Sequence, residues 1–455
     1  MGKDQGRRIG SAEELAGALR IAAELEHGLC CQYLFAAFTL RRTLEDFAGI
    51  PAEEDAKRHV MALTQAWATQ ILTVARQEME HLAIVINLQS ALGEPPHLAR
   101  PNFPVPLGSY PIKAHFCLER LEGTTLERFL FYERPDYLAK ELKFDDPGCC
   151  EDKAFRNAPP LALASHAGLS FDSVQELYQT LAGAYSGPDE LPAAVLFRGS
   201  AAAQVQSSAV QWAQSVNVPP VTNRLDAIAA IDQVTFEGEG IGETPTSPSS
   251  HFVRFAEVNR SYVELRHALP GVDPALPVVC NPAVSGAAPP GSKQITDPAA
   301  VLAMRLFNDG YFLMLAMLRG FFEGYRGNFG TYPTFAGAAP NSALFLEAYY
   351  PFMTMFIRPL GELVCRLPAG PEHPGKNAGP GFELTGEPPG LQDLDWYADR
   401  FTQLDQAGRE LHVWLADHEA TYGPDAVLAA ERQSLALQRM RLNLPRLWKE
   451  GVLNP

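Results

Sequence analysis

The stretch RQEMEHLAIV, residues 76–85, places two glutamates and a histidine just before an apolar run in a long helix-forming segment. Glu78 and His81 are three residues apart, so on a helix they share one face with Cβ atoms about 5–6 Å apart. An E-x-x-H pair occurs by chance in many helices. It indicates a metal site only if other helices supply matching acids, because carboxylate-bridged dimetal bundles combine such pairs with glutamates from two further helices.

The preceding helical segment carries a further acidic position. In the stretch ELEHGLCCQYLFAAF, residues 24–38, Glu26 and Tyr33 are seven residues apart, which is about two helical turns, and therefore share a face. A lone glutamate on a helix usually lies on a solvated face, and that alternative holds for Glu26 if nothing accompanies it. However, Fe and Mn take oxygen and imidazole ligands, and bridging carboxylates balance the charge of two cations. Glu26, Glu78 and His81 together fit such a site.

Two later segments offer the remaining candidates. Glu176 lies near the start of a predicted third helix, and Glu237 and Glu239 lie beside glycines at the end of a fourth. His251 follows Glu239 by twelve residues, so the two do not form an E-x-x-H pair on one helix. The intervening loop has to bring His251 back beside Glu239 for both to bind one metal. The sequence leaves open whether Glu237 or Glu239 is the ligand.

Helical periodicity covers most of the chain, and strand signals are sparse, so the predicted fold is mainly α. Ser11 followed by Glu14 is a capping box that starts the first helix. Gly93, followed by two prolines after Glu94, ends the second. The predicted helices cover about residues 12–42, 53–93 and 116–134, then run from 173, from 224 and from 251, and continue over 298–325, 342–367, 391–421 and 424–450.

The chain divides into two helical parts around a proline-rich stretch. Residues 1–265 are predicted to form the metal-binding domain, 266–297 a Pro-rich linker, and 298–455 a C-terminal helical region. The helices over 298–325 and 342–367 have nearly continuous apolar faces that must be buried against something. The simplest partner is the metal-binding bundle, so we expect the C-terminal region to pack on it and close part of a substrate pocket.

Composition excludes several classes of function. The formal net charge of −16, without any Lys/Arg-rich run, argues against a nucleic-acid partner. The apolar window at 311–322 contains Arg319 and is shorter than the roughly 20 residues of a membrane span, so we expect no membrane contact. The N-terminus lacks the hydrophobic region of a secretory signal, and seven scattered cysteines suit reduced thiols. These features predict a cytoplasmic protein.

Several stretches, in order along the chain, resemble the ferritin-like domain of the iminophenylpyruvate dimer synthase type, a family found in violacein and bisindole pathways. The resemblance spans about residues 12–260, and its most specific parts are ARQEMEHLAIVINLQSALGEPP and the GEG-loop-SHF block. It implies a ferritin-like helical bundle with a C-terminal helical extension. Cys30 and Cys31 stand where many members have proline or small residues, and Glu237 stands where glutamine is common. The metal ligands that the resemblance implies are Glu26, Glu78, His81, Glu176, Glu239 and His251.

The resemblance also implies a function. It predicts a non-haem oxidoreductase with two Fe ions, or with Mn or mixed metals, that uses dioxygen or peroxide to oxidise a small natural-product intermediate. Oxidative coupling of an amino-acid-derived imine is the reaction that the relatives suggest. The alternatives are a metal-binding or iron-storage-like protein and a non-catalytic partner of a biosynthetic enzyme. The long C-terminal region disfavours storage, and the sequence leaves open the substrate and whether the chain forms a homo-oligomer.

Overall fold

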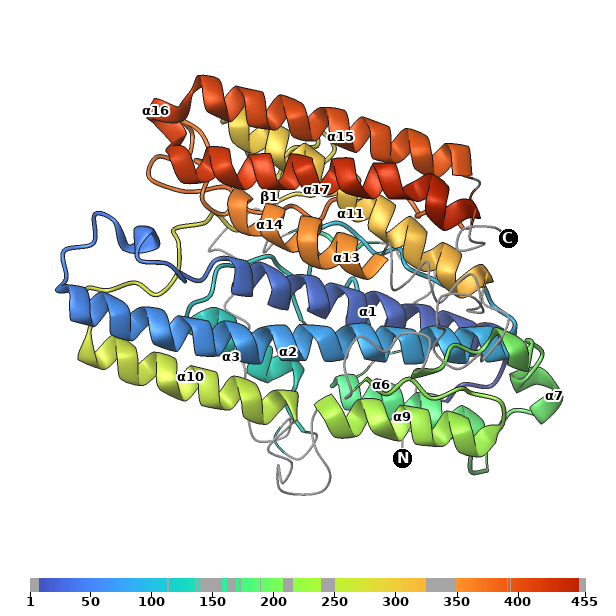
Figure 1. The fold of residues 1–455 in the computed structure, drawn as a ribbon. Helices are drawn as coiled ribbons and strands as arrows, with labels where there is room; N and C mark the ends of the chain where they lie inside the picture. Colours follow the sequence, from blue (N-terminus) through green and yellow to red (C-terminus); the bar gives the residue numbers. More distant parts are fainter. Residues whose placement is uncertain are drawn as a thin grey trace.

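The fold is mainly α, as predicted (Figure 1). The structure is a computed structural model. It describes residues 8–449 except 113, 136–137, 139–157, 162–168, 170, 172, 189, 208–215, 239–249, 325–348, 391 and 393.

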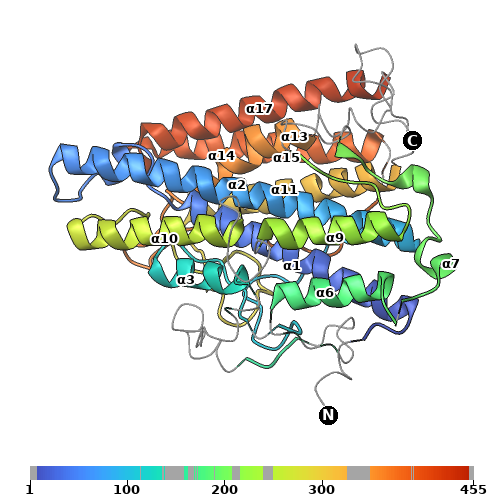
Figure 2. The same cartoon turned by 90° about the horizontal axis from the view of Figure 1, so that it is seen from below.

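The first half of the chain forms a four-helix bundle in which two helices are continuous and two are divided. The continuous helices α1 and α2 pack side by side along their length. Figure 2 shows α3 and α6 lying end to end as a third bundle position, and α10 and α9 lying end to end as a fourth. The bundle helices are α1 (Ala12–Phe38), α2 (Glu54–Leu92), α3 (Gly123–Tyr132), α6 (Val174–Tyr185), α9 (Arg224–Gly238) and α10 (His251–Ala268).

Local sequence sets where the divided helices stop and restart. Pro135 follows the end of α3 by three residues, and proline disfavours helical conformation in the residue before it. The restarts are capped, because Ser173 Oγ accepts from Glu176 N at 3.1 Å and Ser250 Oγ accepts from Val253 N at 3.4 Å. Both interruptions fall at the middle of the bundle (Figure 2).

Two helix boundaries differ from the sequence prediction. The first helix ends at Phe38 rather than near residue 42, because Leu40 pairs instead with Ala275 in an antiparallel bridge. The third helix begins at Gly123 rather than at residue 116, because Phe116 pairs with Val105 in the same way. In both places a backbone partner distant in sequence competes with the local helix.

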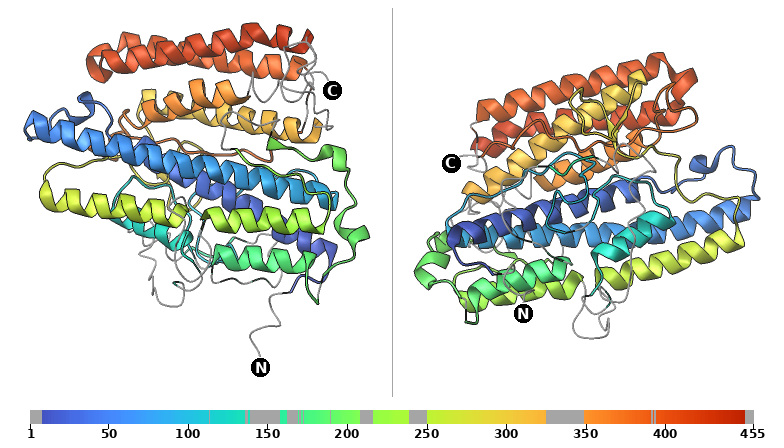
Figure 3. Two further views of the ribbon diagram at one scale, coloured as in Figure 1. Left: turned by 60° about the horizontal axis from the view of Figure 1, so that its bottom comes forward. Right: turned by 180° about the vertical axis from the view of Figure 1, so that it is seen from behind.

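The C-terminal helices lie on the side of the α1–α2 pair away from α3 and α9 (Figure 3). Gly361 of α14 allows close approach to α1, since a Cβ at this position would lie 2.7 Å from the Phe38 ring. In the structure α14 thus packs on α1, while the division into domains at 265 and 298 and the role of the second part stay predictions. These elements are α11 (Pro298–Gly324), α13 (Tyr350–Phe352), the π-helical turn η4 (Met353–Ile357), α14 (Arg358–Val364), α15 (Leu394–Asp417), α16 (Glu419–Tyr422) and α17 (Pro424–Lys449).

The Pro-rich segment between the two halves is well packed in the structure. It contains the two-stranded parallel sheet of β1 (Pro282–Ala283) and β2 (Lys293–Gln294). Ala275 and Val278 are buried, and Val279 N donates to Asn377 O at 2.9 Å. The segment thus fills space between the bundle and the C-terminal helices.

Among the described helices, the span Pro298–Glu323 of α11 has the length and apolar composition of a membrane-crossing segment. In the structure, 67% of its most apolar window is buried among other helices, which is the environment of a core helix. The cysteine prediction is wrong in one respect, since Cys117 and Cys280 are disulfide-bonded. Cys30, Cys31 and Cys365 are buried free thiols. The cytoplasmic compartment stays a prediction.

One buried ion pair fastens the C-terminal layer to the loop after α1. Arg366 Nε and Nη2 donate to the two carboxylate oxygens of Asp46 at 2.8 and 2.9 Å, and the Asp46 side chain is 4% exposed. Burial by itself would raise the pKa of Asp46. The charge of Arg366 and its hydrogen bonds outweigh burial, so the pKa is lowered.

We expect Asp46→Asn to lower the free energy of unfolding at neutral pH by roughly 1–3 kcal/mol, because Arg366 loses its charged partner. A lowered folded-state pKa stabilises the protein above the unfolded value of about 3.9, and this stabilisation is lost as the pH falls through the folded-state pKa. The difference in denaturant midpoint between wild type and variant should therefore be smaller at about pH 3 than at about pH 6. Asp399→Asn, at an exposed helix position, is the control. An equal gap at both pH values would contradict this account.

Candidate metal centre

Six acidic and histidine side chains meet at the middle of the bundle, where the divided helices are interrupted. Of the continuous helices, α1 contributes one residue and α2 contributes two. The interrupted helices contribute residues at or beside their broken ends. The six are Glu26 of α1, Glu78 and His81 of α2, Glu133 directly after α3, Glu237 near the end of α9, and His251 at the start of α10.

Glu78 lies between the two imidazoles. Its Oε1 is 2.9 Å from His251 Nδ1, and its Oε2 is 3.6 Å from His81 Nδ1. The two imidazole rings are stacked with centroids 5.3 Å apart. One carboxylate therefore touches both histidines, which is the position that a bridging carboxylate occupies in a two-metal site.

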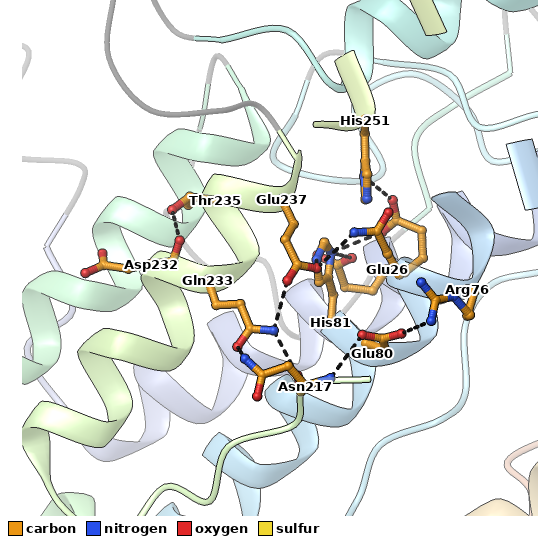
Figure 4. Close-up of polar contacts among 12 residues, drawn as sticks. Glu26, Arg76, Glu80, His81, Asn217, Asp232, Gln233, Thr235, Glu237 and His251 are labelled. Atoms are coloured by element: carbon orange, nitrogen blue, oxygen red, sulfur yellow. Dashed lines mark hydrogen bonds and ion pairs between the residues drawn. The ribbon is translucent and has the colours of Figure 1, made fainter. Parts of the chain in front are cut away.

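The remaining acids divide between the two histidines, and Figure 4 shows Glu26 and Glu237 beside His81. His81 Nδ1 lies 3.4 Å from Glu26 Oε2, and His81 Nε2 lies 3.3 Å from Glu237 Oε2. His251 Nδ1 lies 3.3 Å from Glu133 Oε2. The cluster thus has two adjoining groups of one histidine and its acids, with Glu78 common to both.

Two buried tyrosines orient the carboxylates from outside the cluster. The Tyr178 hydroxyl of α6 donates to Glu26 Oε1, and the Tyr33 hydroxyl of α1 donates to Glu133 Oε1. Tyr33 is held in turn by edge-on contact with the Phe129 ring, with centroids 4.6 Å apart. Hydrogen bonds of this kind fix the direction in which a carboxylate presents its free oxygen.

Glu237 is held by a chain of hydrogen bonds that leads away from the cluster (Figure 4). Its Oε1 accepts from Gln233 Nε2 at 3.1 Å, and Asn217 Nδ2 donates to Gln233 Oε1 at 2.8 Å. The backbone N of Asn217 lies 3.4 Å from Glu80 Oε2, and Glu80 pairs with Arg76 at 3.3 Å. The chain ties α9 to α2 and fixes the orientation of the least buried of the six side chains, which is 20% exposed.

Burial and mutual charge set the protonation of the cluster. Burial raises the pKa of Glu26 to about 7, and the negative charge of Glu78 acts in the same direction. Burial would lower the pKa of His251, but Glu78 and Glu133 outweigh it and raise that pKa to about 9. Burial likewise opposes the charged form of His81, yet its carboxylate neighbours raise its pKa well above the usual value. The acids therefore favour positive charge at their centre.

The donor set fits transition-metal ions. Glu78, His81 and His251 each offer a ligand atom within 4.8 Å of the others, and all three are buried. Glu26 Oε2, Glu78 Oε1 and His251 Nδ1 lie at ion-pair distance from neighbouring groups of the cluster but make no aligned hydrogen bond among the described residues, and His251 Nε2 makes none either. Buried polar atoms are rarely left in this state. Carboxylate oxygens and imidazole nitrogens together suit Fe, Mn and Zn.

The structure brings four of the six residues predicted from the sequence into one cluster: Glu26, Glu78, His81 and His251. Glu176 is half-buried and lines a separate pocket with Arg8 and Thr180. Its neighbour Gln175 and Tyr178 line the metal-site pocket, and a helix turns about 100° per residue, so position 176 points away from that pocket. Glu239 lies outside the described residues. The metal-binding role of all six stays a prediction.

Glu133 was missed by sequence reasoning, and a signal for it was present. It lies four residues after Phe129 in a segment predicted to be helical with Phe129 inward, so it falls on the same face. The inward position of Glu133 was missed because a glutamate next to Arg134 and close to Pro135 has the composition of a solvated helix end. Glu237, which the sequence left as an alternative to Glu239, contacts His81 directly.

Comparison with known proteins gives consistent matches. Residues 19–260 match the Ferritin-like family. Dichlorochromopyrrolate synthase of Lentzea aerocolonigenes is 27% identical over 461 residues, covering 92% of this chain and 42% of that protein. The 2-imino-3-(indol-3-yl)propanoate dimerase of Chromobacterium violaceum is 27% identical over 387 residues, covering 82% of this chain and 34% of that protein. These matches confirm the resemblance predicted from the sequence, and the chain spans less than half the length of either enzyme.

A solved ferritin-like protein from Caulobacter vibrioides is 19% identical, with a TM-score of 0.40 and coverage of 75% of this chain and 97% of that one.

Glu133 and Glu176 can be compared directly by mutation. We expect Glu133→Ala to weaken metal binding at least ~10-fold, because a buried oxygen donor beside His251 is lost. Glu176→Ala should leave metal binding unchanged, because its side chain faces another pocket. Metal content per chain, measured by plasma mass spectrometry after dialysis against a weak chelator, gives the result. Metal loss in the Glu176 variant with retention in the Glu133 variant would reverse the assignment.

Proposed function

We propose that this chain, which belongs to the ferritin-like family, is an oxidoreductase that holds two transition-metal ions and couples small aromatic molecules oxidatively. The buried cluster of acids around His81 and His251 carries the proposal. Its ligand atoms lie in the bundle interior, and its free oxygens and ring nitrogens converge. A purely structural network of ion pairs would align these buried atoms into hydrogen bonds, and here they are not aligned.

The arrangement of side chains suggests how two ions are held. His81, Glu26 and Glu237 surround one position, and His251 and Glu133 border the other. Iron is the metal that we expect, with Mn or a mixed pair as alternatives, because the donors are carboxylates and imidazoles without thiolates. When bound, such a pair supplies electron transfer between an organic substrate and dioxygen or peroxide.

The chain's own groups prepare this site by orientation and by exclusion of water. Tyr178 and Tyr33 fix the carboxylates of Glu26 and Glu133 through their hydroxyl hydrogens. The rings of Phe129 and Phe255 pack against Tyr33, with Phe255 4.9 Å away between centroids. This aromatic group closes one side of the cluster with apolar surface, which keeps bulk water from reacting with an oxidised intermediate.

The relatives indicate the substrate class. One is named a dimerase of 2-imino-3-(indol-3-yl)propanoate and the other a dichlorochromopyrrolate synthase. We propose that this chain likewise joins two aromatic 2-imino acids. The new bond between two substrate molecules forms with the release of two protons and two electrons. If dioxygen accepts these protons and electrons, the product is hydrogen peroxide. If hydrogen peroxide accepts them, the product is two molecules of water.

His81→Ala is expected to remove most of the roughly two metal ions per chain that a ferritin-like dimetal site holds. The fold should persist, since helical content and thermal transition depend on a core far larger than one site. His97→Ala is the matched control, because His97 also pairs with a glutamate, Glu24, at 3.0 Å but lies outside the cluster. Full metal content in the His81 variant would count against the site.

The activity is tested with the imine formed from indole-3-pyruvate and ammonium, supplied to the metal-loaded chain in air. We expect dioxygen uptake in an oxygen electrode together with a product whose mass is twice that of the imine minus two hydrogens. His81→Ala should show neither. If the chain binds metal and takes up dioxygen in the absence of substrate, but forms no dimer when substrate is supplied, it is instead a metal-storage protein.

A further inference from the structure

An apolar cavity lies on the opposite side of the α1–α2 pair from the metal cluster. Its walls come from α1, α2, α11, η4 and the neighbourhoods of Val218 and Phe382. On α1 the lining begins at His27, beside Glu26 of the cluster, and on α2 it includes Leu82, beside His81. Adjacent positions on a helix point about 100° apart. On each of these two helices, one residue can therefore face the metal cluster while its neighbour faces the cavity.

The far wall of the cavity contains an irregular helical turn. Residues Met353–Ile357 form a π-helix between α13 and α14, and Met353 and Ile357 both line the cavity. Single π-turns within helices occur often at functional sites, because the extra residue widens the helix and displaces side chains. Gly310 of α11 sits opposite this turn, where a Cβ would lie 2.5 Å from the Phe356 ring. The close approach of α11 to the π-helical turn therefore requires a glycine at position 310.

The lining combines thioethers and aromatic rings. Met79, Met314 and Met353 reach the cavity from three separate elements, and Tyr349 and Phe322 add rings. Contacts between sulfur and an aromatic ring are favourable, and thioether side chains adapt to a flat ligand. This lining suits a polarisable planar ring better than a branched alkyl group.

Polar groups mark one end of the cavity. The Tyr311 hydroxyl contacts His27 Nε2 and lies 3.1 Å from Cys31 Sγ, and all three residues line the cavity. Arg100 stands behind Tyr311, with its guanidinium carbon 5.9 Å from the ring centroid, and is held by Phe382 O at 2.6 Å. A ligand that enters with its ring among the methionines finds the polar atoms of His27 and Tyr311 at this end, in a lining that also includes Glu80.

We propose that this cavity binds the aromatic ring of the substrate, with a ring N–H or another polar ring substituent directed to the His27–Tyr311 end. The identification of this ligand as the substrate rests on the proposed function. Cys30 and Leu82 line the cavity on helices that also carry the cluster, with Leu82 next to His81 and with Cys30 Sγ 3.4 Å from Ala75 O of α2. The ring therefore lies within about one helix diameter, roughly 10 Å, of the metal cluster.

Indole is the ligand for the first test, which uses the wild-type chain labelled with ¹³C at its methionine methyl groups. The chain has nine methionines, so each methyl signal can be assigned by single substitution. Titration should shift the signals of Met79, Met314 and Met353 and leave that of Met304, which is buried on α11 but does not line the cavity. Shifts confined to other methionines, or no saturable shift, would overturn the proposal.

A matched pair of substitutions on α11 tests the role in turnover. Leu318→Trp fills the cavity, whereas Leu302→Trp adds the same bulk at a partly buried position outside it. We expect Leu318→Trp to weaken indole binding and to raise KM for the imine at least ~10-fold, which corresponds to about 1.4 kcal/mol. The control and the metal content of both variants should stay near wild type. If Leu318→Trp does not fold, the methionine titration still decides the question.

The two proposals fail separately. Saturable indole binding at the three methionines in His81→Ala, together with no coupling in the wild type, keeps the cavity and removes the proposed reaction. Coupling in the wild type with no methionine shift, and with an unchanged KM in Leu318→Trp, keeps the reaction and removes the cavity as its ring site.

Discussion

The contact between Glu78 and His251 is the constraint on which the bundle's middle depends. A carboxylate in the interior of a helical bundle is costly unless an opposite charge or a metal ion meets it. Glu78 lies on a continuous helix, so its position is fixed by the packing of α2 on α1. His251 can meet it at 2.9 Å only if α10 begins at that level. The interruption between α9 and α10 is therefore part of the site.

Both divided helices follow the same logic. An unbroken helix would place only every third or fourth residue toward the cluster, at fixed heights. An interrupted helix can bring side chains from a C-terminal end and an N-terminal end to one level, as Glu237 and His251 do. Glu133, at the end of α3, and Tyr178, in the first turns of α6, repeat this arrangement on the other side.

The α1–α2 pair separates two environments. One side is rich in acids and imidazoles, and the other is lined with thioethers and rings. The C-terminal helices create the second environment by covering a face that the bundle alone leaves open. The C-terminal region supplies the outer wall of this second environment, including the π-helical turn at Met353–Ile357.

The sequence by itself determined the helical class, most helix boundaries, the E-x-x-H pair and the family, because periodicity, capping residues and Gly-Pro endings act locally. It also predicted Glu26 and His251, whose helices are well defined. Only the tertiary structure placed Glu133, and not Glu176, beside the other acids and histidines, since this depends on which way a short helix is rotated after a long connection. The pairing of Leu40 with Ala275 and the position of the cavity could not be predicted from local sequence patterns either, because both arise from contacts between segments more than 200 residues apart.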